Sequence, residues 1–192
     1  MNIIDRVKNI LTTPKTEWLV IDTEQATPMT LLTGYVLPLA ILASLANVLR
    51  SLFFAGGFGT YFIYSAVIGF VSILIGYYVS IYVIDLLAPS FDSEKNLNKS
   101  AQLVAYSNTP IWVAAFLSFI PVIGWLLAIA GWVYSIYLFY IGLTTMKKTP
   151  EDKKVVYMII AFIVMFAITF IISSILMASF VGSTMMGTGR FF

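Results

Sequence analysis

The chain has 192 residues, of which 60% are hydrophobic and only 10% are charged, whereas soluble domains carry roughly 25% charged residues. This composition excludes an ordinary soluble fold. The 11 basic and 9 acidic residues leave a net charge of +2, too small for a nucleic-acid partner held through its phosphates. Because the sequence contains no cysteine and no histidine, we expect no disulfide, thiolate nucleophile, haem or ordinary zinc site, and hence no cofactor and no metal.

The first 29 residues are expected to form a cytoplasmic or interfacial segment. Apolar residues recur here at the spacing of one helical face, and charged or polar ones fall opposite; the two faces are Ile3, Ile4, Val7, Ile10 and Leu11, and Asp5, Arg6, Lys8 and Asn9. The pattern predicts an amphipathic helix over residues 2–12 that lies in the headgroup plane, with recruitment of a protein partner as the alternative. Thr13-Pro14 ends it and can start a second helix, in which Trp18 suits the membrane interface. Without a central apolar run, the segment is not expected to be a cleavable signal peptide.

Five stretches are apolar over roughly 18 residues or more, which is long enough to cross about 30 Å of hydrocarbon. They lie near residues 30–53, 61–86, 101–119, 122–145 and 155–180. The sequence therefore predicts an all-α integral membrane protein, a bundle of five transmembrane helices within residues 30–182, followed by a short outer tail at 183–192. The third stretch is interrupted by Asn108-Thr109-Pro110. The alternative is a re-entrant third segment that leaves four true spans.

Lysine and arginine residues near the span ends predict the orientation. With five spans, the N-terminus and the loops at 87–100 and 146–154 share one side, which collects nine basic residues against two on the other. The nine are Arg6, Lys8, Lys15, Lys95, Lys99, Lys147, Lys148, Lys153 and Lys154, and the two are Arg50 and Arg190. Since basic residues accumulate in the cytoplasm, we expect the N-terminus inside and the C-terminus outside.

Glycines and other small residues predict turns and helix contacts. The segment 54–59 is rich in glycine and uncharged, and it is typical of a tight hairpin between the first two spans. Small residues spaced by four allow two membrane helices to approach closely. We expect most of these pairs to mark helix contacts within the chain, and any others to mark contacts between copies in an oligomer. The four pairs are Ser65 and Gly69, Gly76 and Ser80, Gly124 and Ala128, and Gly131 and Ser135.

A polar cluster lies in the third span. Pro110 lacks an amide proton, so the carbonyl of Tyr106 loses its helical donor and the helix is expected to kink. Ser107, Asn108 and Thr109 could satisfy the freed backbone groups, which makes the cluster structural. Alternatively, residues Tyr106 to Pro110 line a polar cavity near the midplane, because broken helices often mark solute or ion sites in transporters.

Three further polar residues fall at membrane depth. Arg50 and Asp85 lie near opposite ends of the first two spans, so the antiparallel topology predicts that they do not pair. Arg50 is expected to reach outer phosphates, and Asp85 to reach Lys95, Lys99 or cytoplasmic water. Asn47 needs a partner on a neighbouring helix.

The catalytic inventory of the spans is poor. The predicted spans contain no histidine, cysteine or glutamate and one peripheral aspartate, Asp85. Hydrolysis requires paired carboxylates, an activated nucleophile or a metal cluster. We therefore expect a protein that is not an enzyme.

Four motifs occur together in one order along nearly the whole chain. They are Thr13-Pro14-Lys15-Thr16-Glu17-Trp18, the segment from Tyr35 to Leu39, the Tyr-Ser-x-x-Pro of Tyr106 to Pro110, and Tyr137, Tyr140, Gly142 and Leu143 at the close of the fourth span. This set resembles the bacterial branch of the Yip family, the Ypt/Rab-interacting membrane proteins. The resemblance implies five spans, a cytoplasmic N-terminus and, for a bacterial member, the inner membrane. Eukaryotic members act in vesicle traffic with Rab-type GTPases, but the short N-terminal region here resembles bacterial members, so that role is not transferred.

The favoured function is that of a non-enzymatic membrane scaffold or interaction protein. Its partners would be the lipid bilayer and either further copies of the chain or other membrane proteins. The alternative is a small-solute or ion permease with its site at the kinked third span. A permease needs a water-accessible polar path at the midplane, so solvent access at Asn108 distinguishes the two.

Overall fold

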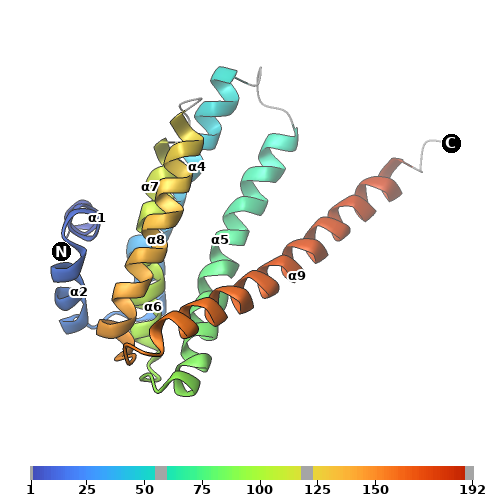
Figure 1. Ribbon diagram of the computed structural model, residues 1–192. Helices are drawn as coiled ribbons and strands as arrows, with labels where there is room; N and C mark the ends of the chain where they lie inside the picture. Colours follow the sequence, from blue (N-terminus) through green and yellow to red (C-terminus); the bar gives the residue numbers. More distant parts are fainter. Residues whose placement is uncertain (1, 55–59, 118–122, 189–192) are drawn as a thin grey trace.

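The computed structural model describes residues 2–54, 60–117 and 123–188, and the side chains of 2–46, 70–117, 123–172 and 174. Every regular element within these ranges is helical (Figure 1). The predicted all-α class is therefore confirmed. The hairpin predicted at 54–59 lies almost entirely outside the described residues, and so do the side chains of Asn47, Arg50, Ser65 and Gly69.

The N-terminal segment forms two short helices, α1 (Ile3–Thr12) and α2 (Pro14–Thr23). The side chain of Asn2 accepts a hydrogen bond from the amide of Ile4 and so caps α1. Thr13 separates the helices, and Pro14 occupies the first turn of α2, where its missing amide proton costs nothing. The helix predicted for residues 2–12 and its stop at Thr13-Pro14 are both confirmed.

The first predicted span begins with a widened turn. It runs without interruption through α3 (Pro28–Leu31), the π-helical turn η1 (Leu32–Val36) and α4 (Leu37–Phe54). In η1 the amide of Leu37 bonds to the carbonyl of Leu32, five residues back. The next residue is Pro38, whose ring would clash with the carbonyl four residues earlier in an ordinary helix. The wider turn thus accommodates Pro38 without breaking the span.

The chain then continues through α5 (Thr60–Leu87), the 3₁₀ turn η2 (Ala88–Phe91), α6 (Leu97–Ser107), α7 (Thr109–Leu117), α8 (Ile123–Lys147) and α9 (Lys154–Thr188). Within the described residues, four helical stretches are long and apolar enough to cross a membrane: Pro28–Ala46, Phe70–Phe91, Ile123–Lys147 and Lys154–Ile172. The predicted third span is not among them, because it is divided into helices of 11 and 9 residues at Asn108. The predicted count of five continuous spans is therefore not confirmed.

The helices form a tight group and a divergent arm. In Figure 1, α4, α7 and α8 run side by side, α6 continues the line of α7, and α9 leans away from the bundle beyond its contact with α5. Helices α7 and α8 approach closely at Gly131 in α8, where an added Cβ would lie 2.7 Å from the Cβ of Ala114 and 2.8 Å from the carbonyl oxygen of Pro110. The small-residue signal at Gly131 thus marks a real helix contact, whereas Gly76 faces open space.

Candidate functional site

Charged side chains gather at one end of the bundle, which we call the charged end. It comprises α2, the C-terminus of α5, the N-terminus of α6 and the junction of α8 and α9, while α1 packs beside the bundle nearer its middle (Figure 1), where the Tyr134 hydroxyl donates to the carbonyl of Leu11. The N-terminal segment and the loops at 87–100 and 146–154, predicted to share one side, meet here. The contacts that join them include Lys99 with Asp22, Lys153 with Asp92, and the hydroxyl of Ser93 donating to that of Thr149 at 2.9 Å.

Asp85 and Lys147 form a buried ion pair at this end. Lys147 is fully buried, and its Nζ lies 3.0 Å from Oδ1 of Asp85 and 2.8 Å from Oγ of Ser100. Ser100 also donates to the same carboxylate oxygen at 3.0 Å. The prediction that Asp85 reaches Lys95, Lys99 or water was wrong. The partner of Asp85 is Lys147 at the end of α8, and Lys99 pairs with Asp22.

Arg6 is buried too, although it lies on the polar face of a helix that was expected in the headgroup plane. It is 4% exposed, its Nη1 lies 2.5 Å from Oε1 of Glu17, and its Nη2 pairs with Glu24. Its guanidinium also lies over the ring of Tyr106, with Cζ 5.2 Å from the ring centroid. A charge between apolar positions reads as solvated on a helical wheel, and only the partners Glu17 and Glu24 reveal its burial.

The apolar face of α1 and the ring of Trp18 pack against protein. Ile10 is fully buried, and Ile3, Val7 and Leu11 pack around the core, while Ile4 stays 70% exposed. Trp18 was predicted to lie at the membrane interface, but its side chain is only 1% exposed. The lack of a side chain at Gly142 makes room for it, since an added Cβ there would lie 2.8 Å from the Trp18 ring. The segment is thus docked on the bundle.

Polar contacts fasten the C-terminal half of this segment. Asp22 contacts Nζ of both Lys99 and Lys148 at 2.9 Å. The side-chain amide of Gln102 donates from Nε2 to the backbone carbonyls of Ile21 and Glu24. Burial by itself raises the pKa of the Asp22 carboxyl, but the two lysines outweigh it and hold that pKa below its usual value. The carboxylate therefore supports docking above about pH 4 and loses this effect as pH falls through the lowered pKa.

The kinked third span presents its predicted polar residues to two different sides. Thr109 is fully buried, and its hydroxyl lies 2.7 Å from that of Tyr35 on η1. Tyr106 faces the same side and stacks edge-on with Tyr35, with centroids 4.8 Å apart. Ser107 and Asn108 instead line a cavity on the opposite side. Tyr106 therefore borders one cavity, while Ser107 and Asn108 border another.

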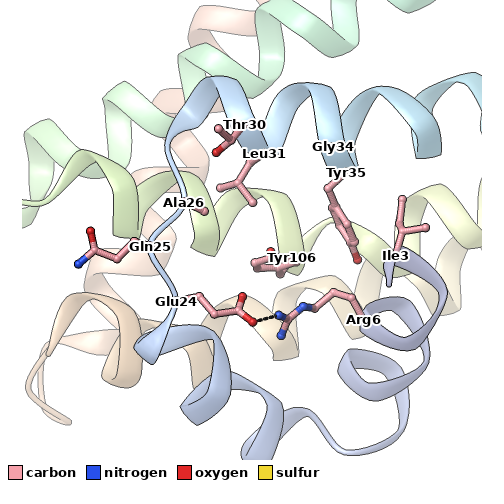
Figure 2. Close-up of a pocket in the computed structure, with 10 residues that line it drawn as sticks. All are labelled: Ile3, Arg6, Glu24, Gln25, Ala26, Thr30, Leu31, Gly34, Tyr35 and Tyr106. Carbon is pink, nitrogen blue, oxygen red and sulfur yellow. Dashed lines mark hydrogen bonds and ion pairs between the residues drawn. The ribbon is translucent and has the colours of Figure 1, made fainter. Parts of the chain in front are cut away.

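A cavity of about 460 Å³, the N-terminal cavity, lies beside Tyr106. Figure 2 shows Arg6 extending from α1 toward Glu24, with Tyr106 and Tyr35 nearby. Its ten lining residues are Ile3, Arg6, Glu24, Gln25, Ala26, Thr30, Leu31, Gly34, Tyr35 and Tyr106. Since both Arg6 and Glu24 are already paired, the charge that borders this cavity is largely neutralised.

Asn108 lies at the break between α6 and α7. It caps α6, and its side-chain amide donates to the carbonyl of Val104 at 2.9 Å. Its backbone carbonyl accepts from the amides of Ile111 and Trp112 at 3.1 and 3.2 Å, which restarts the helix as α7. The side-chain bond goes to the carbonyl of Val104, which also accepts from the backbone amide of Asn108, and not to the carbonyl of Tyr106 that Pro110 leaves without its helical donor.

The described residues contain no group of three or more histidine, cysteine, aspartate or glutamate side chains that could hold a metal ion. What they offer is a docked N-terminal segment, two cavities and several ion pairs. The Yip1 domain matches residues 8–173 of this sequence, which is most of the chain. The chain belongs to the Yip1-domain family. Members of this family are generally non-enzymatic transport or trafficking proteins. No curated protein and no solved structure matches the chain.

Membership of the Yip1-domain family fits a multi-pass membrane protein with four candidate spans in its described part. The family match also explains why the resemblance could be detected in sequence. Two of the four motifs contain buried residues, Glu17 and Trp18 in one and Tyr106 and Thr109 in the other. Tyr106 contacts Arg6 and Trp18 of the docked segment, whereas Thr109 contacts Tyr35. The partners Lys147, Gln102 and Glu24 carried no comparable sequence signal, because each is a single polar residue at a helix end or in a helix.

Proposed function

We propose that this Yip1-domain protein is a non-enzymatic membrane scaffold that crosses the bilayer five times, with the charged end in the cytoplasm. The observation that carries the proposal is the docking of α1 and α2 on the bundle, in which Arg6 lies over the ring of Tyr106, Asp22 pairs with Lys99 and Trp18 is buried. Docking leaves a rigid outward surface that includes Ile4, at 70% exposure, and Leu19, at 62%. A surface held in place by buried ion pairs is suited to contact a partner protein or the membrane surface.

The path of the chain supports five crossings. Asp85 near the end of α5, Ser100 near the start of α6 and Lys147 at the end of α8 meet in one contact. The chain therefore leaves the charged end along α6 and α7 and returns to it along α8. Residues 97–117 hold 21 positions, which at 1.5 Å per residue extend about 30 Å, long enough to start in the headgroup layer and cross most of the hydrocarbon core. A bacterial inner-membrane location belongs to the same proposal.

The permease alternative is weaker because the polar residues at the kink do not converge. Tyr106 lines the N-terminal cavity and Thr109 contacts Tyr35, whereas Ser107 and Asn108 line the other cavity. A solute pathway would need a continuous polar lining. Among the described residues, the Tyr35–Thr109 contact and the Asn108–Val104 bond use these groups within the protein.

The scaffold proposal predicts that position 108 is poorly accessible to water. In membranes, the single variant Asn108→Cys is expected to react with a small water-soluble thiol reagent on the order of 100-fold more slowly than Glu151→Cys, because the thiol would lie in an apolar, half-buried setting. Glu151 is a suitable exposed control, since its side chain is 75% exposed. Ser93 and Thr149 are unsuitable because both are buried. Rapid modification of Asn108→Cys that an ion or solute blocks would favour the permease.

The orientation is tested with the same cysteine-free background. In intact cells, Thr23→Cys and Glu151→Cys are expected to resist an impermeant thiol reagent, and Ser183→Cys is expected to react, because the charged end carries most of the basic residues. Labelling after cell lysis shows that the protected cysteines are reactive. If the reagent modifies Glu151→Cys from outside, the proposed topology is excluded.

A further inference from the structure

A second cavity, which we call the serine cavity, opens between α5, the α6–α7 break, α8 and α9. Its volume is about 530 Å³, within the range of roughly 300–1,000 Å³ that small-molecule sites occupy. Most of its lining is apolar and aromatic, and the residues on which the argument depends are Ile84, Ser107, Trp132, Ser135, Phe139 and Phe166.

Two buried hydroxyl groups in this lining have no hydrogen-bond partner among the described residues. Ser107 and Ser135 are 3% and 7% exposed, and the Oγ atom of each is unpaired. A serine in a membrane helix can bond to the carbonyl four residues earlier, as Ser44 does with Ala40 at 2.8 Å. An unpaired buried hydroxyl destabilises the folded state, because it has given up its hydrogen bonds to water without replacing them. The two serines are therefore either a cost to the fold or a means of binding a polar atom.

The two hydroxyl groups lie at the same level of the bundle. Helices α6 and α7 run antiparallel to α8, with Gly131 against Pro110 and Gly142 against Leu103. This register places Ser135, one turn past Gly131, beside Ser107, three residues before Pro110. A single polar group on a ligand could contact both.

The outer part of the cavity is continuous with the apolar outer surface of the bundle. Trp132 and Phe166 are 64% and 71% exposed, and they belong to two of the candidate membrane spans. The inner part is closed, because Ile84 and Phe139 are buried. An apolar molecule that lies in the bilayer can thus enter from the side, while a solute in water would have to cross lipid first.

The depth of the serines identifies the polar group. Ser107 lies seven residues from Ser100, which contacts the Asp85–Lys147 pair, so it sits about 10 Å from the charged layer along the helix. The headgroup region is roughly 5–8 Å deep on each side of the hydrocarbon. If the charged end lies among the headgroups, the serines lie near the upper acyl chains. The polar groups closest to that level in a membrane lipid are its ester carbonyls, which accept hydrogen bonds and donate none.

We propose that the serine cavity binds one acyl chain of a membrane glycerolipid, whose ester carbonyl accepts hydrogen bonds from the hydroxyl groups of Ser107 and Ser135. The acyl chain of the lipid lies between α8 and α9, against the side chains of Phe139 and Phe166. This binding satisfies both hydroxyls and fills the space left where α9 diverges from the bundle.

The test uses full-length protein in vesicles of phosphatidylethanolamine and phosphatidylglycerol that contain a phosphatidylethanolamine with a photoreactive diazirine in one acyl chain. Illumination should label peptides from α8 and α9 around Ser135 and Phe166, and excess unlabelled lipid should compete. The double variant Ser107→Ala/Ser135→Ala is expected to lose this labelling roughly two- to tenfold for each hydroxyl removed. Ser44→Ala, whose hydroxyl bonds within its own helix, is the matched control.

Thermal unfolding in detergent provides an independent readout that does not depend on labelling. Added phosphatidylglycerol should raise the melting temperature of the wild type and raise that of the double variant less. Without lipid, the double variant should melt at or above the wild-type temperature, because it buries no unpaired hydroxyl. Equal labelling and equal lipid response in the two proteins would overturn the proposal. Two other outcomes would also overturn it: a disulfide-linked dimer from Trp132→Cys in native membranes, which would place a second copy over the cavity, and rapid reaction of Ser135→Cys with a water-soluble thiol reagent, which would show that water fills it.

Discussion

Replacing Lys147 by methionine is expected to lower the free energy of unfolding by about 3–5 kcal/mol. The Nζ atom of Lys147 is the cation nearest the buried Asp85 carboxylate, at 3.0 Å, and methionine fills a similar volume without a charge. The variant therefore leaves Asp85, which is 6% exposed, as a buried charge whose one remaining hydrogen-bond donor among the described residues is the Ser100 hydroxyl. The free energy can be measured by reversible unfolding in mixed detergent micelles.

Two further variants separate the ion pair from general packing. Lys148→Met removes a neighbouring lysine whose side chain is 57% exposed, and it should cost less than about 1 kcal/mol. The double variant Asp85→Leu/Lys147→Met should recover most of the loss, since replacing a buried pair by apolar residues is often neutral or stabilising. A double variant as unstable as Lys147→Met would show that the lost stability comes from packing and not from the unpaired charge.

The second large effect is expected from Arg6→Met, which should detach the N-terminal segment from the bundle. Arg6 pairs with Glu17 and Glu24 and lies over the Tyr106 ring, so the variant leaves Glu17 buried without its cation. Because residues 2–24 can undock and return Glu17 to water, the loss should appear as local opening instead of global unfolding. A loss of about 3 kcal/mol corresponds to opening on the order of 100-fold more often.

Trypsin cleavage after Lys15 measures this opening, because Lys15 lies within the docked α2 helix. Cleavage of Arg6→Met should accelerate by that factor while the melting temperature of the transmembrane bundle changes little. The control is Lys8→Met, which removes an exposed charge from the same helix. Equal cleavage rates in the two variants would contradict a structural role for the Arg6 contacts. They would also count against the scaffold proposal, which depends on the docking of α1 and α2.

The sequence by itself determined the features that follow from composition and local spacing. An excess of apolar residues with few charges requires helices in a membrane, since backbone groups in lipid must bond within their own segment. The one-sided pattern of residues 2–12 and the Thr13-Pro14 stop predicted α1 and the start of α2 correctly. The lack of a donor at Pro110 likewise predicted the break after Ser107, because this effect depends only on the chain itself.

Only the tertiary structure decided which polar groups meet. Arg6 and Trp18 were predicted to face solvent or the membrane interface, but both are buried, because Glu17, Glu24 and the space at Gly142 lie opposite them. Asp85 pairs with Lys147 and not with a lysine closer to it in sequence, because α5 and α8 end at the same level of the bundle. Helical spacing determines which residues share a face. It does not determine what that face contacts, because the contact depends on how distant helices are arranged, and for the kinked third span that arrangement divided one predicted site between two sides.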